Sequence, residues 1–187
     1  GTGSVGIDLG LKDSATTSSG DKLTIKQTLK YAKDLATAQR AKNKQHVKAI
    51  HAKIKNTRQD LIHKFTTQLV KDNALIVVGD VKTTQFNSKK GKLAKSVYDA
   101  GWFELKRQLT YKCENAGCRF EIVNERYTTQ TCSCCGDMSS SLSGRAGLRI
   151  REWTCVKCDT RHDRDINASK NILAVGLDRL GAGIPSL

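Results

Sequence analysis

Four cysteines in the second half of the chain have the spacing of a metal site. Cys132 and Cys135 form one C-x-x-C pair, Cys155 and Cys158 form another, and nineteen residues lie between the two pairs. Two thiolates on one tight turn chelate Zn²⁺, and a second pair closes a tetrahedral site. A site with four cysteine ligands leaves no open position, so the predicted zinc is structural rather than catalytic. Clustered thiols of this kind indicate metal binding in a reducing compartment.

The other three cysteines are not needed for this site. Cys134 lies between two predicted ligands, and we expect it to point outward, although it could compete as a ligand. Cys113 and Cys118 fall at a predicted helix end and a predicted strand start. We interpret them as core or surface thiols rather than as a second metal site.

Carboxylates at element ends suggest a second kind of chemistry. Asp8 lies in "SVGIDLG", and Asp163 and Asp165 lie in "HDRDINASKNI", just before a predicted helix. One interpretation is that an acid at that place is simply a helix cap. The alternative is a ligand for catalytic metal, because hydrolysis of a phosphodiester by two Mg²⁺ ions needs carboxylates that converge on ions about 4 Å apart. Asp80, at the end of the apolar run "ALIVVGDV", is a further candidate.

The elements that must position these residues follow a recognisable order. We expect a strand at 4–10, two strands within 13–27, a helix or helical hairpin at 29–72 and a strand at 74–81. A helix at 93–117, a strand at 118–125, a cysteine-rich insert and a helix at 167–183 follow. This order predicts an α/β, RNase H-like (RuvC) mixed sheet flanked by helices, with an inserted zinc ribbon. The expected divisions are 5–129 and 161–187 for the sheet domain and 130–160 for the ribbon.

The charge of the chain indicates a polyanionic partner. The 187 residues include 32 Lys and Arg against 18 Asp and Glu, a formal net charge of +14. Such an excess is typical of proteins that bind nucleic acid, although a run of charge can also be only a solvated helix face. No apolar run approaches the roughly 20 residues that span a bilayer. The candidate contacts to nucleic acid are Lys42, Lys44, Lys48, Lys55, Arg58, Arg145, Arg149 and Arg151.

Four ordered motifs resemble one known family. "GIDLG", "YTTQTCSCCG", "REWTCVKC" and "HDRDINASKNIL" are similar to motifs in the carboxyl-terminal half of TnpB (OrfB) proteins, which are transposon-encoded, RNA-guided nucleases. The resemblance implies a RuvC-like endonuclease that cleaves DNA at three acids holding two Mg²⁺ ions, with a guide RNA as partner of the full-length protein. It also implies a cytoplasmic, nucleoid-associated monomer. Domains that hold guide and target would precede this segment.

The chain departs from the family at the second acid. Asp8 and Asp165 match the first and third, but Gly79 stands where the catalytic Glu of the fourth strand would be. Asp80 cannot replace it, because neighbouring residues of a strand face opposite sides. We expect Glu125, at the end of the adjacent parallel strand, to fill the gap.

Other readings of the same residues remain open. Glu121 lies further back along the strand and should not reach the metal ions. If no acid fills the gap, the chain is a catalytically inactive, RNA-guided DNA-binding protein that acts as a repressor. A junction resolvase on the same fold is disfavoured by the ribbon and the basic helix. Tyr127 lies near the expected active rim and could stack on a base.

Overall fold

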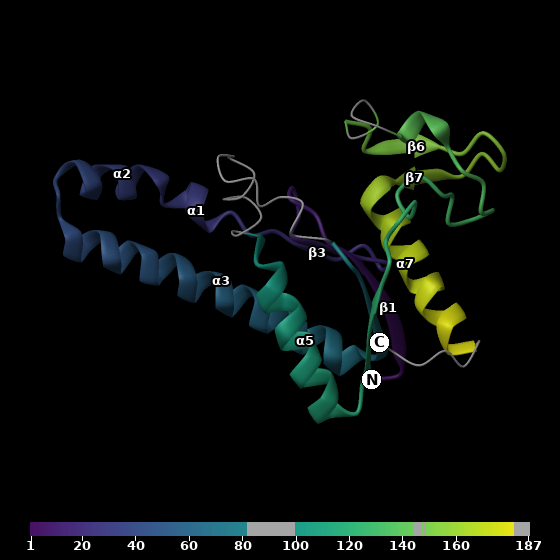
Figure 1. Ribbon diagram of the computed structural model, residues 1–187, viewed down its shortest axis with the longest axis horizontal. Coiled ribbons are helices and arrows are strands. Elements are labelled where there is room, and N and C mark those ends of the chain that lie inside the picture. Colours follow the sequence, from purple (N-terminus) through teal and green to yellow (C-terminus); the bar gives the residue numbers. More distant parts are fainter. Residues whose placement is uncertain (82–99, 144–146, 148, 182–187) are drawn as a thin grey trace.

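A five-stranded mixed sheet forms the centre of the molecule. The computed structural model describes residues 1–81, 100–143, 147 and 149–181. The strand order is β3-β2-β1-β4-β5; the pairs among the first three strands are antiparallel, and β1, β4 and β5 are parallel. The strands are β1 (Gly3–Asp8), β2 (Ala15–Thr17), β3 (Lys22–Leu23), β4 (Asn73–Gly79) and β5 (Arg119–Val123). The predicted RNase H-like fold is confirmed (Figure 1). The basic loop after β4, and the start of the helix expected from residue 93, lie outside the described residues.

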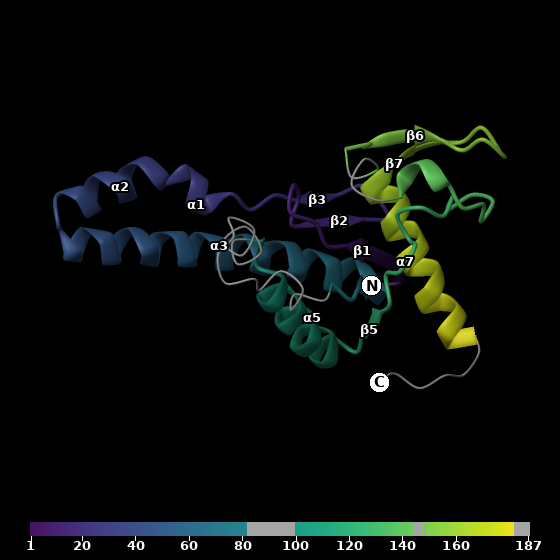
Figure 2. The ribbon, with the colours of Figure 1, turned by 45° about the horizontal axis from the view of Figure 1, so that its top comes forward.

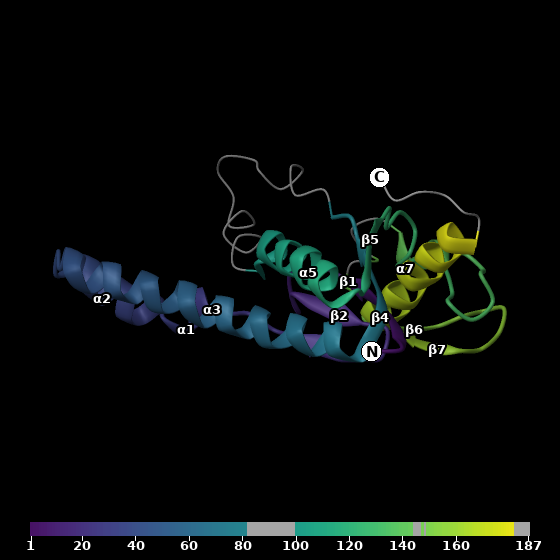
Figure 3. The same ribbon diagram turned by 90° about the horizontal axis from the view of Figure 1, so that it is seen from below.

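Helices cover both faces of the sheet. Alternate residues of β4 are buried on opposite sides. Ile76 and Val78 belong to the cluster on the side of α3 (Lys44–Asp72) and α5 (Trp102–Ala116), whereas Leu75 and Val77 pack with Ile172 of α7 (Arg164–Gly181). A strand buried on both faces has to be apolar at nearly every position, and this accounts for the run "ALIVV". Figure 3 shows α5 and α7 on opposite sides of the strands.

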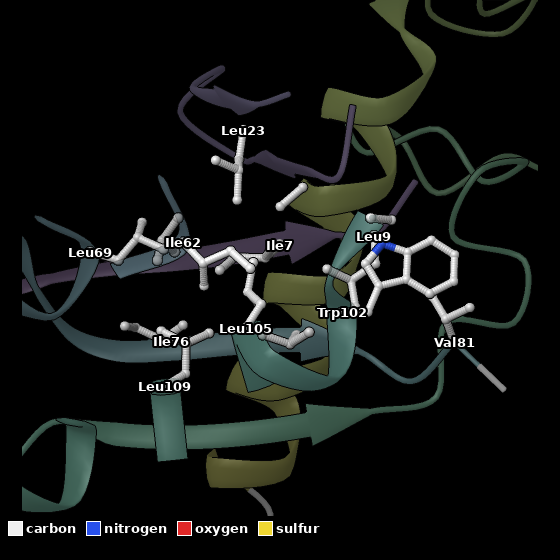
Figure 4. Close-up of a cluster of buried hydrophobic side chains, with 14 of the residues drawn as sticks. Ile7, Leu9, Leu23, Ile62, Leu69, Ile76, Val81, Trp102, Leu105 and Leu109 are labelled. Atoms are coloured by element: carbon white, nitrogen blue, oxygen red, sulfur yellow. The ribbon is translucent and has the colours of Figure 1, made fainter. Parts of the chain in front are cut away.

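The larger core joins the sheet to two helices. Ile7 and Ile76 from the sheet meet Ile62 of α3 and Leu105 and Leu109 of α5 (Figure 4). These side chains are completely buried. Trp102 closes the end of this core and donates its Nε1–H to the Ser14 carbonyl at 3.0 Å, as expected for a buried indole.

The basic segment folds as a helical hairpin that projects from the sheet (Figure 2). Its elements are α1 (Gln27–Lys30), α2 (Ala32–Arg40) and α3 (Lys44–Asp72). The 29 residues of α3 give a rod about 43 Å long. Asn43 begins it, accepting a hydrogen bond from the His46 amide at 3.0 Å. Far from the sheet, the hairpin is held by a small cluster around Ala38, Ile50 and Ile54.

Among the described residues, the rest of the chain adds, besides a 3-10 helix at Ser140–Leu142, two α-helices and a small hairpin. They are α5 (Trp102–Ala116), which ends at left-handed Gly117, and α7 (Arg164–Gly181), with β6 (Glu152–Thr154) and β7 (Arg161–Asp163) between them. The helix α7 begins three residues earlier than the sequence pattern indicates. The cause is Asp163, whose Oδ1 accepts the amides of Asp165 and Ile166 at 2.9 and 3.0 Å and so caps the first turn.

Small residues bring α7 very close to the sheet. A Cβ on Gly6 of β1 would lie 2.0 Å from the Ser169 carbonyl oxygen, and one on Gly176 of α7 would lie 2.5 Å from Val77. Only glycine fits either place. The close approach sets the first turn of α7 beside the carboxyl end of β1.

Candidate active site and zinc site

The three predicted catalytic acids line one pocket. Its volume is about 410 Å³, and it opens at the carboxyl ends of the parallel strands. Ligands of open α/β sheets bind at this edge. The pocket is lined by Asp8, Leu9, Gly10, Glu125, Thr128, Thr129, Arg151, Arg164 and Asp165.

Two of the three acids come from regular elements. Asp8 is the last residue of β1 and is only 9% exposed. Asp165 lies within the first turn of α7, rather than before the helix as the sequence suggested. The cap is Asp163, which also pairs with Lys22 at 3.2 Å. With the amides already capped by Asp163, the carboxylate of Asp165 is free to face the pocket.

Glu125 fills the space that a side chain at position 79 would occupy. A Cβ built on Gly79 would lie 2.8 Å from Oε2 of Glu125 and 3.2 Å from its Cβ. Gly79 pairs with Val123 in the parallel ladder, so Glu125 lies two residues beyond the end of β5. The side chain of Glu125, which follows β5, therefore occupies the space left empty by Gly79 of β4.

The other acids near this edge face elsewhere. Asp80 is bound by Lys106 of α5 at 3.1 Å, which places it on the opposite side of the sheet from Gly79. Its amide donates to the Val123 carbonyl at 2.7 Å. Glu121 is buried and accepts from Arg119 at 2.9 Å. Neither Asp80 nor Glu121 lines the pocket.

The pocket concentrates negative charge in a poorly solvated place. Burial, together with the nearby carboxylates of Asp165 and Glu125, raises the pKa of Asp8 to about 8. Burial also raises the pKa of Glu125, with Lys106 opposing and Asp80 adding to the effect. Carboxyls that resist ionisation until a cation arrives are typical of a metal site.

A hydrogen-bond network joins this pocket to the zinc ribbon. The amide and hydroxyl of Thr128 donate to the Glu125 carbonyl at 3.2 and 2.8 Å. Asn167 and Asn171 of α7 both donate to the carbonyls of Thr128 and Thr131, at 2.7–3.3 Å. Oδ1 of Asn167 accepts the Ser133 amide, one residue after a predicted zinc ligand, at 2.9 Å. The turn that carries Glu125 is therefore fixed from α7.

The four predicted zinc ligands come together. The sulfur atoms of Cys132, Cys135, Cys155 and Cys158 all lie within 4.8 Å of one another. Two of the separations are 3.6 and 3.7 Å, close to the roughly 3.8 Å expected for a tetrahedron with Zn–S bonds of about 2.3 Å. The geometry fits Zn²⁺. Among the described residues, no other His, Cys, Asp and Glu side chains form so tight a group, so the acids of the pocket are spread more widely.

Sequence reasoning missed one neighbour of this cluster. Nε2 of His162 lies 3.0 Å from the sulfur of Cys132, and its ring lies against Trp153 with centroids 4.7 Å apart. A ring N–H directed at a thiolate is a typical partner of a metal ligand. The only signal was a histidine four residues after the last knuckle. Cys134 is exposed and outside the cluster, and Cys113 is buried in the main core, as expected.

Comparison with known proteins identifies the family. A model described as "Probable transposase" (OrfB IS605) matches residues 1–88, and one described as "Cas12f1-like, TNB domain" matches residues 102–172. The chain is 36% identical to a Streptomyces pristinaespiralis protein named "Putative RNA-guided DNA endonuclease", over 97% of this chain and 47% of that protein. The chain belongs to the TnpB (OrfB) family. A second relative, "Putative RNA-guided DNA endonuclease InsQ" of Escherichia coli (strain K12), is 31% identical over 96% of this chain and 50% of its own length.

The fold of this TnpB-family chain also occurs in a solved structure. The structure titled "Cryo-EM structure of the Cas12f1-sgRNA-target DNA complex" superposes with a TM-score of 0.68 at 17% identity, over 90% of this chain and 49% of that one. The chain spans about half the length of these two named endonuclease relatives. None of the described helices is long and apolar enough to cross a membrane.

Two arginines belong to the pocket rather than to an outer surface. Arg151, predicted as a nucleic-acid contact, lies 3.4 Å from Asp165, with 47% of its side chain exposed. Arg164 was not predicted; it is buried and donates to the Gly147 carbonyl. The amide of Arg164 also donates to the Arg151 carbonyl at 2.7 Å, which joins the ribbon to the start of α7.

The remaining basic candidates lie in different environments. Lys42, Lys44, Lys48 and Lys55 are exposed on the hairpin. Arg58 differs, because it is 8% exposed and lies against Gly101 at the start of α5. Arg149 is exposed in the ribbon, and Arg145 lies outside the described residues.

Proposed function

We propose that this segment is the nuclease domain of an RNA-guided DNA endonuclease and that it hydrolyses phosphodiester bonds with two Mg²⁺ ions. The observation that carries the proposal is the place of Glu125, in the volume next to Gly79 and in one pocket with Asp8 and Asp165. Support comes from the relatives named as RNA-guided DNA endonucleases. The proposed domain division is 5–129 and 161–187 for the nuclease and 130–160 for the ribbon.

The residues of the pocket suit this chemistry. Asp8, Glu125 and Asp165 would hold the two ions, and a spread of carboxylates wider than a single-ion cage suits two ions about 4 Å apart. When bound, Mg²⁺ supplies an activated water and stabilises the leaving oxygen. Arg151 lines the pocket with 47% of its side chain exposed and would bind the phosphate being cut. The positive charge of Arg164, whose guanidinium donates to the Gly147 carbonyl, reduces the electrostatic repulsion among the acids.

The zinc ribbon would serve the nuclease as a scaffold. With all four positions of Zn²⁺ taken by sulfur, the metal cannot bind substrate. Its loops instead carry Arg151 to the pocket and, through Ser133 and Asn167, fix the turn of Glu125. The guide RNA and DNA would lie along the exposed lysines of the hairpin, contacting backbone phosphates without reading sequence.

Cleavage of a guide-matched plasmid by the full-length protein and its guide RNA tests the proposal. Glu125→Ala should abolish Mg²⁺-dependent cleavage, whereas Asp80→Asn should leave it intact because Asp80 faces Lys106. A parent protein that binds target but never cuts would replace the nuclease with a DNA-binding repressor. Cleavage by Glu125→Ala together with its loss in Asp80→Asn would refute the assignment of the second acid.

A further inference from the structure

Tyr127 has a backbone conformation that its turn does not explain. Its φ is +67°, in the left-handed region that bulky residues rarely adopt. Glycine enters this region without steric cost, and Gly136 does so in the first zinc knuckle. A turn that needed only the shape of the backbone would be more stable with glycine at position 127. The tyrosine side chain must therefore make a contribution that offsets the steric cost of its left-handed backbone.

The ring does not compensate by packing in a core. Tyr127 is 44% exposed, whereas both tryptophans are buried at 3% and 9%. The turn is held by the main chain: the Tyr127 carbonyl accepts the amides of Gln130 and Thr131 at 2.9 and 3.0 Å and the Thr131 hydroxyl at 3.0 Å. None of these bonds involves the ring. The structure fixes the backbone of Tyr127 and leaves an aromatic side chain at the surface.

Tyr127 stands in the chain between residues that line the pocket. Glu125 precedes Tyr127 by two residues, Thr128 and Thr129 follow it, and all three line the pocket with Asp8 and Asp165. The guanidinium of Arg126 lies 4.7 Å from the centre of the Tyr127 ring. An exposed aromatic ring paired with a cation is the usual element of a surface that binds single-stranded nucleic acid.

We propose that Tyr127 is a stacking platform for a nucleobase adjacent to the phosphate held in the pocket, with Arg126 neutralising the backbone beside it. The inference rests on the proposed function and narrows its substrate to single-stranded DNA. A base in a duplex has both faces covered by its neighbours, so the ring can reach only a base that has left the stack. Stacking tolerates any base, as a guide-directed nuclease requires.

Binding in Ca²⁺ tests the platform without cleavage. A short single-stranded oligonucleotide is titrated into the full-length protein with its guide RNA, and fluorescence anisotropy gives the Kd. Tyr127→Gly should weaken binding by about 5-fold or more, the effect of one lost base–aromatic stack, while its melting temperature stays equal or rises because the left-handed strain is relieved. Tyr127→Phe should bind like the parent, and duplex DNA should bind equally to all three. Equal single-strand binding by the Gly variant would overturn the proposal.

An abasic scan locates the stacked base. The guide fixes the register of a matched target, and one abasic nucleotide is moved along the cleaved strand while single-turnover cleavage is measured. The parent should slow at one position, and Tyr127→Gly should show no extra loss there. A position that slows both proteins equally would remove the tyrosine from the contact. If the parent does not cut but the Ca²⁺ result holds, the platform survives and the nuclease proposal fails.

Discussion

Exchanging Gly79 and Glu125 is the sharpest test of the relocated acid. A Cβ at position 79 would lie only 3.2 Å from the Cβ of Glu125. The two positions are thus alternative anchors for one carboxylate, separated by less than the reach of a glutamate side chain. The double variant Gly79→Glu, Glu125→Gly should return the acid to the pocket from β4.

The expected magnitudes follow from the same contacts. Glu125→Gly should lower cleavage at limiting Mg²⁺ by at least about 100-fold, since even an indirect partner of a metal ligand costs about 10–100-fold when it is lost. Gly79→Glu alone should also lose activity, because its Cβ would lie 3.2 Å from the Cβ of Glu125 and two carboxylates would then overlap in one volume. Combining the two removes that overlap and leaves a contact of 3.0 Å with the flexible end of Ile172. The double variant should therefore recover at least about tenfold over Glu125→Gly.

The assay is single-turnover cleavage across a range of Mg²⁺ concentrations, with melting temperatures to confirm folding. Recovery that appears mainly as a lower half-saturating Mg²⁺ concentration indicates that the restored carboxylate holds metal. A double variant that folds but is no more active than Glu125→Gly would refute the idea that the two positions share one role. Full activity of Gly79→Glu alone would show that a side chain at position 79 does not overlap Glu125.

Three other properties should follow from the structure. The pKa of Asp8 is raised from 3.8 to about 8, so without metal the folded state keeps a proton that the unfolded state releases. The stability of the metal-free protein therefore falls as pH rises from about 4 toward 8. Mg²⁺ should raise the melting temperature more at pH 8 than at pH 6, and an equal rise at both pH values would contradict this. Asn167→Ala should cost about 1–3 kcal/mol by leaving the Ser133 amide without its acceptor and should weaken Mg²⁺ binding, because only Asn171 would still hold the Thr128 carbonyl. A colorimetric zinc assay should still find one zinc per chain; loss of the zinc would mean that the ribbon depends on this residue. Lys48→Ala should reduce the slope of log affinity for DNA against log salt by about 1, whereas Arg58→Ala, at a buried site, should lower the melting temperature instead.

Period-two alternation made the sheet and its acids predictable. Because Asp80 and Gly79 are neighbours on one strand, their opposite directions followed from the sequence, and Lys106 indeed binds Asp80 on the far side. The parallel pairing of β4 with β5 likewise followed from the order of elements. The four candidate zinc ligands could be predicted from the spacing of the cysteines alone.

Contacts between distant segments could not be derived in this way. The side chain of Arg151 reaches Asp165 because the ribbon folds back over α7, and no local pattern records that path. Arg58 has the same spacing as exposed lysines on a basic helix, yet α5 covers it. The cap at Asp163 shifted a helix start by three residues, since two acids in one motif compete for the same role.

The packing of α7 against β1 also determines when a competent site can exist. The first acid belongs to the first strand, and the third belongs to the last helix, so the pocket closes only through contacts between the two ends of the described fold. Such long-range closure is slow compared with formation of local structure. During synthesis, the sheet strands and the helical hairpin would leave the ribosome well before α7. A chain that stopped before this helix would carry most of the fold but lack Asp165, so under the proposed function it could not cut DNA before the domain is complete.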